Sequence, residues 1–453
     1  MSAAAGGSRS EGVDILARQD RIPVWSLPWT YLAIIGIGYF FTFYDITDIG
    51  FAMPAVNRQF NLSSGESLFL AVAIGLIGYL VGSLVIGTLA DRYGRFRLLI
   101  LTILLTAVGS FGDAAAPGIA TLTVFRFITG MGVGADLNLV STYVGELAPA
   151  AQRGRISVLT FLFGILGQAV TPFVALGLVP NLYIGWRLLF VIGGVIAAIG
   201  LAGRLELPES PRWLVLHGHV DEADRLVTRM EETARDRVGE LPDPDPAAAD
   251  VSLRGFPTRF LFRLPYARRL ALFVPMWFFW YIGNYGFLGD AAQLYKNQGL
   301  SAGILYLAIG AIGYPVGALL MMAAVERVER RWLIFGATLV WLAGMLMVGT
   351  AAGEGIVIGG SFLASLALGS YLQAAYTYTA ESYPTRARAS GFAFSDGIGH
   401  LGGVVGAVVL PILVTDLSFF AGFAIIGVTG LVAGGFAAFG PSSTRQSLEQ
   451  VSA

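Results

Sequence analysis

Seven ionisable residues within long apolar stretches of this 453-residue chain are its strongest candidates for chemistry. The acids are Asp45, Asp48, Asp136, Asp290 and Asp396, and the bases are Arg126 and His400. A stretch of about 20 apolar residues can cross a bilayer, and an ionisable group inside it is costly unless it is paired. We therefore expect these residues to pair with one another and to serve the movement of a proton or a polar solute.

Asp45 and Arg126 are predicted to meet. Asp45 lies about eight residues from the outer end of its apolar stretch, roughly 12 Å at the helical rise. Arg126 lies about six residues from the same end of a later stretch, roughly 9 Å deep. Pairing favours the ionised carboxylate, whereas a dry cavity without the pair favours the protonated form, so a proton on Asp45 can be coupled to conformation. A static structural ion pair is the alternative.

Candidate solute-binding residues lie near the middle of the membrane by the same arithmetic. They are Gln168, Tyr281, Asn284, Tyr376, Asp396 and His400. Asp396 and His400 are four residues apart on one helix face, so the carboxylate can stabilise a charged imidazole. Burial favours the neutral ring, and the sequence leaves both states open. A charged His400 suits an anionic solute, a neutral one suits hydroxyl groups, and simple packing against a neighbouring helix is the alternative to both.

Apolar stretches must form the elements that position these residues. Hydrophobic residues make up 55% of the chain and charged residues only 13%, which is typical of a membrane protein. Windows of about 20 residues give spans near 28–54, 67–90, 98–118, 120–146, 155–180, 185–205, 266–294, 301–325, 331–352, 356–381, 388–414 and 416–440. We predict an all-α membrane protein with twelve transmembrane helices in two pseudo-symmetric bundles of six.

The segments between the spans divide the chain into five parts. They are an N-terminal tail (1–27), a first bundle (28–205), a central loop (206–265), a second bundle (266–440) and a C-terminal tail (441–453). With the N-terminus inside, the outer loops hold only Arg58, Arg187 and Lys296, so the positive-inside rule predicts that both termini are cytoplasmic. Residues 222–238 of the central loop have helical periodicity and a charged face, which favours a solvated helix without a partner.

Two charged motifs occur twice, which indicates a duplicated unit. Asp91-Arg92-Tyr93-Gly94-Arg95 is answered by Glu326-Arg327-Val328-Glu329-Arg330, and Glu146-x-x-Pro149-x-x-x-Arg153 by Glu381-x-x-Pro384-x-x-x-Arg388, both 235 positions later. Parallel membrane repeats are typical of transporters, whose solute site lies between the halves. Pairs between these charges at the inner helix ends would hold the bundles in one of two arrangements and act as a gate. A role in topology and helix packing alone is the alternative.

These motifs resemble those of the major facilitator superfamily. The stretch 87–95 resembles its loop motif, and Arg126-x-x-x-Gly130-x-Gly132-Val133-Gly134 and Pro208-Glu209-Ser210-Pro211-Arg212 resemble its sugar-porter-like branch. The resemblance implies that Asp45 accepts the transported proton beside Arg126. The chain departs from the sugar pattern at 279–286 and at Tyr376, where sugar porters usually carry a tryptophan. Asp136 resembles an acid of the phosphate porters, which the resemblance links to proton coupling.

Together these features favour a secondary active transporter, a proton-coupled symporter that imports a small polar metabolite, either an organic acid or a sugar. A facilitative or efflux carrier and a phosphate symporter are alternatives, which measurements of proton movement would separate. A non-transporting sensor would need a signalling domain, for which the loops leave no room. The expected partners are the solute, protons and the bilayer of the cell membrane. No phosphate-binding glycine loop, metal-ligand cluster or activated nucleophile occurs in the sequence, so we expect no enzyme activity, no cofactor or metal and no nucleic acid.

Overall fold

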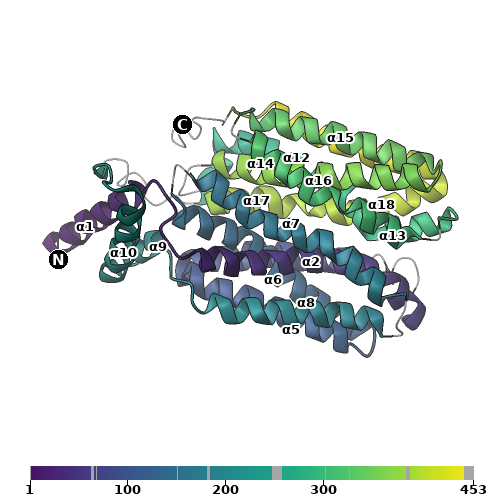
Figure 1. The fold of residues 1–453 in the computed structure, drawn as a ribbon, viewed down its shortest axis with the longest axis horizontal. Helices are drawn as coiled ribbons and strands as arrows, with labels where there is room; N and C mark the ends of the chain where they lie inside the picture. The colour runs from purple at the N-terminus through teal and green to yellow at the C-terminus, as the bar shows by residue number, and fades with distance from the viewer. Residues whose placement is uncertain are drawn as a thin grey trace.

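The structure is a computed structural model, and it describes residues 2–442 apart from 63–65, 68, 150–151, 181–183, 247–257, 301, 326 and 384–387. Of residues 2–9, 71, 91, 153–154, 258, 290, 293 and 388–389 it describes the backbone alone. The described chain is almost wholly helical. It forms two bundles side by side, with a small group of helices at one end (Figure 1).

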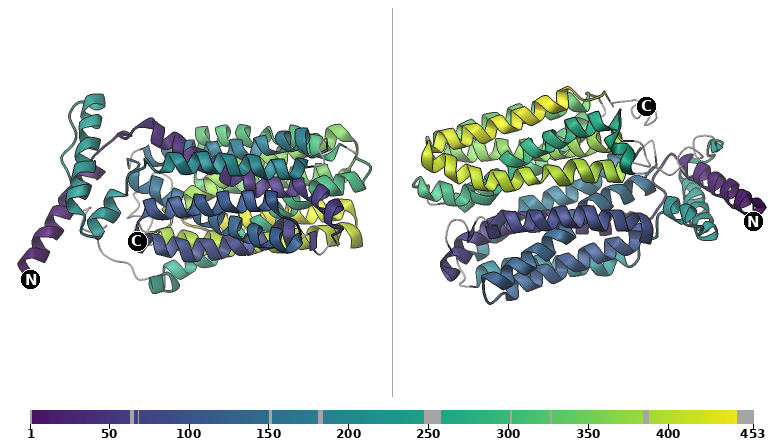
Figure 2. Two further views of the ribbon diagram at one scale, coloured as in Figure 1. Left: turned by 90° about the horizontal axis from the view of Figure 1, so that it is seen from below. Right: turned by 180° about the vertical axis from the view of Figure 1, so that it is seen from behind.

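The first bundle contains the helices of the first half of the chain. They are α2 (Trp29–Phe60), α4 (Ile74–Tyr93) preceded by the π-helical turn η1 (Phe69–Ala73), α5 (Arg95–Ala115), α6 (Ile119–Leu147), α7 (Arg153–Leu178) and α8 (Gly185–Arg204). Each coincides with one of the first six predicted spans. In the view from behind, these purple and blue helices form one layer of the molecule (Figure 2).

The second bundle repeats this arrangement with two interrupted helices. It consists of α12 (Tyr266–Asn297), the pair α13 (Gly303–Gly310) and α14 (Gly313–Ala324), α15 (Arg330–Thr350), α16 (Glu354–Glu381), the pair α17 (Arg388–Gly399) and α18 (Leu401–Asp416), and α19 (Phe419–Ala438). A short 3₁₀ helix, η3 (Thr258–Phe262), precedes α12. His400 lies at the junction of α17 and α18, where its backbone keeps helical angles and its N–H donates to the Asp396 oxygen at 3.0 Å.

Nine helical segments in the described ranges are long and apolar enough to cross a membrane. Three predicted spans are not among them. The apolar segment described within α4 ends at Ala90, because the side chain of the next residue lies outside the described residues. Helix α6 carries Arg126 and Asp136, and α12 carries Asn284, all of which are buried inside the protein. These helices are less apolar because they turn polar groups inward.

Glycines bring α4 and α6 into close contact. A Cβ atom at Gly130 would overlap the carbonyl group of Gly75, and one at Gly134 would overlap that of Tyr79. Small residues at such positions let two membrane helices pack backbone to backbone. The glycines of α6 therefore fix where Arg126 and Tyr79 lie relative to each other.

A helical cap, formed by α1 (Ser2–Asp20), α9 (Pro211–Leu216) and α10 (Val220–Val238), covers one end of the first bundle (Figure 1). Its small core contains Ile15, Leu214, Ala223 and Val227. The prediction of a solvated helix without a partner at 222–238 is therefore wrong, because α10 packs against α1 and α9. The segment expected to be a polar tail likewise contains helix α1.

Two arginines of α1 hold the cap together around one buried acid. Arg18 and Arg21 lie 3.0 and 2.5 Å from the carboxylate oxygens of Glu231 in α10, which is 2% exposed. Burial opposes ionisation of Glu231, but the hydrogen bonds from Arg18 and Arg21 outweigh it and lower the pKa of Glu231. Gln19 Nε2 donates to the backbone oxygen of Glu146 at 2.7 Å, which ties the cap to α6.

Candidate functional site

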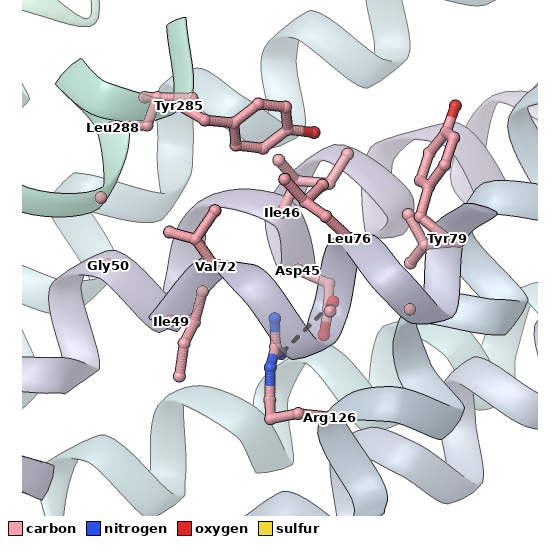
Figure 3. Close-up of a pocket in the computed structure, with 14 residues that line it drawn as sticks. Asp45, Ile46, Ile49, Gly50, Val72, Leu76, Tyr79, Arg126, Tyr285 and Leu288 are labelled. Carbon is pink, nitrogen blue, oxygen red and sulfur yellow. Dashed lines mark ion pairs between the residues drawn. The ribbon is translucent and has the colours of Figure 1, made fainter. Parts of the chain in front are cut away.

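Asp45 and Arg126 lie side by side inside the first bundle. The Arg126 nitrogen Nη1 is 3.5 Å from Asp45 Oδ2 (Figure 3). The same nitrogen lies 3.5 Å from Asp113 Oδ2 and 3.9 Å from Asp48 Oδ1. Each of these side chains is at most 4% exposed. We call Asp45, Asp48 and Asp113, together with Arg126, the acid cluster.

Asp113 is the member of the acid cluster that sequence analysis missed. It lies about five residues from the end of the predicted span 98–118, roughly 8 Å deep at the helical rise. That is close to the depth of Arg126, so the arithmetic that paired Asp45 with Arg126 would have placed Asp113 beside them. The remaining acid of the original set, Asp290, has a side chain outside the described residues.

The members of the acid cluster are unequally hydrogen-bonded. Ser110 donates to Asp45 Oδ1 at 3.3 Å, and Thr129 donates to Asp113 Oδ2 at 3.4 Å. Neither carboxylate oxygen of Asp48 accepts a hydrogen bond from a side chain in the described part of the chain. Nε and Nη1 of Arg126 also have no hydrogen-bond partner among the described residues. The guanidinium is held by its ion pairs and lies over the ring of Phe190. Buried polar atoms without partners are costly, so this arrangement is expected at a site that changes state.

A cavity of about 40 Å³ lies beside Asp45 and Arg126. Tyr79 of the first bundle and Tyr285 and Leu288 of the second complete its walls (Figure 3). A water molecule needs roughly 10–15 Å³ of such space, so the cavity has room for a few waters but not for a sugar. The Asp45–Arg126 pair is therefore accessible from the interface between the bundles.

Asp396 and His400 lie at that interface in a layer of aromatic rings. Asp396 accepts hydrogen bonds from the hydroxyl of Tyr79 in the first bundle and that of Tyr281 in the second, each at 2.7 Å. The His400 ring lies next to the same two tyrosines, with ring centroids 3.7 and 3.8 Å away. We call Tyr79, Tyr281, Asp396 and His400 the central layer. Tyr79 was not foreseen, because a lone tyrosine in an apolar span gives no signal of its partner.

The imidazole of His400 is oriented by its own helix. Nδ1 lies 2.8 Å from the backbone oxygen of Asp396. Because a carbonyl oxygen only accepts, Nδ1 carries a proton, and the state of Nε2 decides whether the ring is charged. The carboxylate of Asp396 is 3.5 Å from Nδ1, close enough to stabilise a positive ring. The geometry thus fits both states that the sequence left open.

The other candidate solute residues fall in two groups. The Tyr376 hydroxyl is 3.4 Å from that of Tyr281, and its ring lies 4.9 Å from Trp277, so Tyr376 adjoins the central layer. Gln168 and Asn284 are buried, and the amide oxygen of each has no hydrogen-bond partner among the residues the structure describes. Each of these amide oxygens can accept one further hydrogen bond.

Asp136 lies in a separate ion pair. Both of its carboxylate oxygens accept hydrogen bonds from the guanidinium of Arg204, at the end of α8, and Thr102 donates to Oδ1 at 2.7 Å. Asp136 is ten residues from Arg126 along α6, or roughly 15 Å. Its charge is therefore compensated away from the acid cluster. This arrangement favours a structural role over the proton coupling that the phosphate-porter resemblance implied.

The repeated motifs form the same ion pair in each bundle. Arg95 Nη2 is 3.1 Å from Glu146 Oε1, and Arg330 Nη2 is 2.8 Å from Glu381 Oε1. Each pair joins two helices of its own bundle. The gate hypothesis, in contrast, expected pairs that hold the two bundles against each other. Arg92 and Arg327 are exposed. The side chains of Asp91, Arg153, Glu326 and Arg388 lie outside the described residues.

A second cavity, of about 220 Å³, lies nearer the helical cap. It is lined by Leu84 of α4, Asn138 of α6 and Phe394 of α17, and so lies between the bundles. Along α4, Tyr79 lies between the residues that line this cavity and those that line the small one. The central layer therefore separates a space beside the acid cluster from a larger space near the cap. Within the described ranges, no group of three His, Cys, Asp or Glu side chains is arranged to hold a metal ion.

Comparisons with known proteins concern the family and the fold. Residues 30–453 match the family described as "Sugar (and other) transporter". The chain is 31% identical to the niacin transporter NiaP of Acinetobacter baylyi over 410 residues, or 89% of this chain and 90% of that protein. It is 28% identical to myo-inositol transporter 2 of Schizosaccharomyces pombe over 90% of this chain and 79% of that protein.

Among solved structures, the chain resembles the partially occluded inward-open conformation of the xylose transporter XylE from E. coli. The TM-score is 0.77 at 20% sequence identity, covering 92% of this chain and 99% of that one. At this identity the likeness concerns the fold. It confirms the predicted class of twelve spanning helices in two bundles.

Proposed function

The chain belongs to the sugar (and other) transporter family, whose members are secondary transporters of the major facilitator fold, and from this premise we propose that it is a proton-coupled symporter for a small polar metabolite. The observation that carries the proposal is the Asp45–Arg126 pair, buried beside a cavity with walls from both bundles. A proton that enters this cavity reaches Asp45 and weakens its attraction to Arg126. Such a change at the interface can bias which side of the molecule is open.

We propose that the central layer contacts the solute. Tyr79, Tyr281 and His400 come from both bundles, and their stacked rings offer flat faces to a solute when the bundles part. Tyr376, Asp396, Gln168 and Asn284 add polar groups around them. Aromatic rings stack favourably on other flat rings, so this layer favours a cyclic organic acid over a sugar. The similarity to a niacin transporter supports the same class.

The helical cap is proposed to lie on the cytoplasmic side of the cell membrane. Arg18, Arg21 and the other basic residues of the cap lie at this end, and Arg58, Arg187 and Lys296 belong to the opposite end. This distribution follows the positive-inside rule. Both termini are then cytoplasmic, and the bundles occupy 28–205 and 266–440. In this orientation the 220 Å³ cavity faces the cytoplasm, because it lies at the end of the bundles nearer the cap.

The proposal is tested with the purified full chain in proteoliposomes. Uptake of labelled nicotinate, benzoate, D-xylose and myo-inositol is measured at an acidic and a neutral external pH, while a dye reports the internal pH. Solute entry that acidifies the interior, and accumulation driven by an imposed pH gradient, support symport. Entry without proton movement identifies a facilitative carrier, and entry that makes the interior alkaline identifies an antiporter. Either of these results overturns the proposal.

A further inference from the structure

The acid cluster contains three carboxyl groups and a single guanidinium. If all three were ionised, Arg126 would compensate one charge and leave two uncompensated in a buried site. Isolated buried charges cost several kcal/mol each, so such groups take up protons instead. The number of protons bound at this site is therefore set by all three carboxyl groups and not by the Asp45–Arg126 pair alone.

The helices packed around the acid cluster supply no second compensating ion pair among the described residues. Helix α8 contributes the ring of Phe190, whose centroid lies 5.9 Å from the guanidinium carbon of Arg126. Arg187 of α8 donates to the backbone oxygens of Ala114 and Ala116 at 2.5 and 2.8 Å. The nearby Tyr44 hydroxyl donates to the backbone oxygen of Leu189 at 3.1 Å, and α4 faces Arg126 with Gly75.

We propose that the acid cluster is a two-proton site, in which Asp48 holds one proton and Asp45 and Asp113 share the second. This proposal rests on the proposed function, because it extends the role of Asp45 from a single proton acceptor to one member of a larger site. It assigns roles to Asp48 and Asp113 that the Asp45–Arg126 pair alone does not require.

Geometry distinguishes the three acids. Asp48 is fully buried, is the farthest from Arg126 Nη1 at 3.9 Å, and accepts no hydrogen bond from a side chain in the described chain. It has the least to stabilise a negative charge, so it holds a proton. Asp45 and Asp113 make equivalent contacts, since each lies 3.5 Å from Nη1 and accepts one hydroxyl hydrogen bond.

This equivalence gives Asp113 a positioning role in proton uptake. Asp45 lines the water-sized cavity, whereas Asp48 and Asp113 do not, so a proton from solvent meets Asp45 first. When Asp45 is protonated, Asp113 keeps Arg126 paired and in place. Proton binding thus exchanges the partner of Arg126 and leaves no unpaired cation in the membrane.

Infrared titration of the full chain in liposomes tests the proposal without a substrate. Protonated carboxyl groups absorb in a region separate from carboxylates, so their number is counted by comparing variants at neutral pH. We expect the wild type to show two buried protonated carboxyls. Asp48→Asn should remove one, and Asp113→Asn should also remove one, because Asp45 then pairs with Arg126 alone and ionises. Glu231→Gln is the matched control, because Glu231 is held ionised by two arginines and should not contribute.

The outcomes separate this proposal from the proposed function. A wild-type count of one or none, or an Asp48→Asn variant that keeps both signals, overturns the two-proton site even if proton-coupled uptake is observed. Uptake without proton movement overturns the proposed function and leaves the infrared count intact. Asp113→Glu should restore the second signal and its titration midpoint, which a role in packing alone would not predict. If Asp113→Asn fails to fold, the wild-type and Asp48→Asn counts still decide the question.

Discussion

The hydroxyl of Tyr79 is a single group whose removal should loosen the contact between the bundles. It donates to Asp396 Oδ2 at 2.7 Å across the interface, and Tyr79→Phe keeps the ring that stacks on His400. A buried hydrogen bond of this kind contributes about 1–3 kcal/mol. A coupling of that size changes an equilibrium about 5- to 150-fold. Conformations in which the central layer has parted should become more populated by this factor.

Cysteine labelling measures that population directly, because the chain contains no cysteine and an introduced thiol is unique. Val72→Cys lies on the wall of the small cavity, and Leu84→Cys on that of the large one. In the Tyr79→Phe background, we expect a maleimide to label Val72→Cys at least about fivefold faster.

Tyr39→Phe is the matched control for this measurement. It removes a hydroxyl that lies 2.8 Å from Ser141 within the first bundle, and it should leave both labelling rates unchanged. Unchanged labelling at both cysteines in Tyr79→Phe would refute the view that this hydrogen bond holds the bundles together. Faster labelling in Tyr39→Phe as well would indicate general loosening of the fold.

Three further changes probe the coupling residue, the solute site and the cap. Asp45→Asn should abolish accumulation against a gradient while counterflow exchange persists, because exchange needs no net proton movement; continued accumulation would contradict the role of Asp45. If His400 is charged and binds an anionic solute, His400→Gln should raise the apparent KM for that solute well over tenfold, since a charge-assisted hydrogen bond contributes about 1.5–3 kcal/mol; an unchanged KM at acidic and neutral pH would exclude His400 from the solute site. Because the pKa of Glu231 is lowered in the cap, the stabilisation it provides is complete above its ordinary value of 4.5 and is lost as the pH falls through the lowered value. Glu231→Gln should therefore speed amide hydrogen exchange in α1 at neutral pH, whereas the wild type should lose this protection only in acid; equal protection in both at neutral pH would show that Arg18 and Arg21 hold the cap without Glu231.

The spans and the Asp45–Arg126 contact could be predicted because both follow from local sequence. A membrane span is marked by its own composition, and depth along a helix follows from a constant rise per residue. Two charges at one depth in neighbouring helices have few alternatives to pairing. The contact of Asp113 with Arg126 could have been predicted in the same way, because Asp113 lies at a similar depth.

Other features depend on contacts that sequence position does not reveal. Arg204 is the last residue of its helix, where an arginine is expected to face the cytoplasm, yet it is fully buried against Asp136. Tyr79 acquires its role from Asp396, a residue of the other bundle. The pairing of α1 with α10 rests on arginines of one segment and an acid more than 200 positions away. The sequence predicted a solvated helix without a partner at 222–238 and only a tail at 1–27.

The duplicated unit has kept its loop pairs but not its interior. At the spacing of 235 positions that relates Arg95 to Arg330 and Glu146 to Glu381, Arg126 corresponds to Ser361, Asp113 to Val348, and Asp396 to Phe161. The first half therefore contains the acid cluster, and the second half contributes most of the aromatic and polar residues of the central layer. Both halves retain the same arginine–glutamate pair at their ends. A proton bound in the first half can change the conformation of the second half only through contacts between the two bundles. The contacts between the bundles, among them those of the central layer and those of α7 with α13 and α14, therefore couple two halves that began as copies.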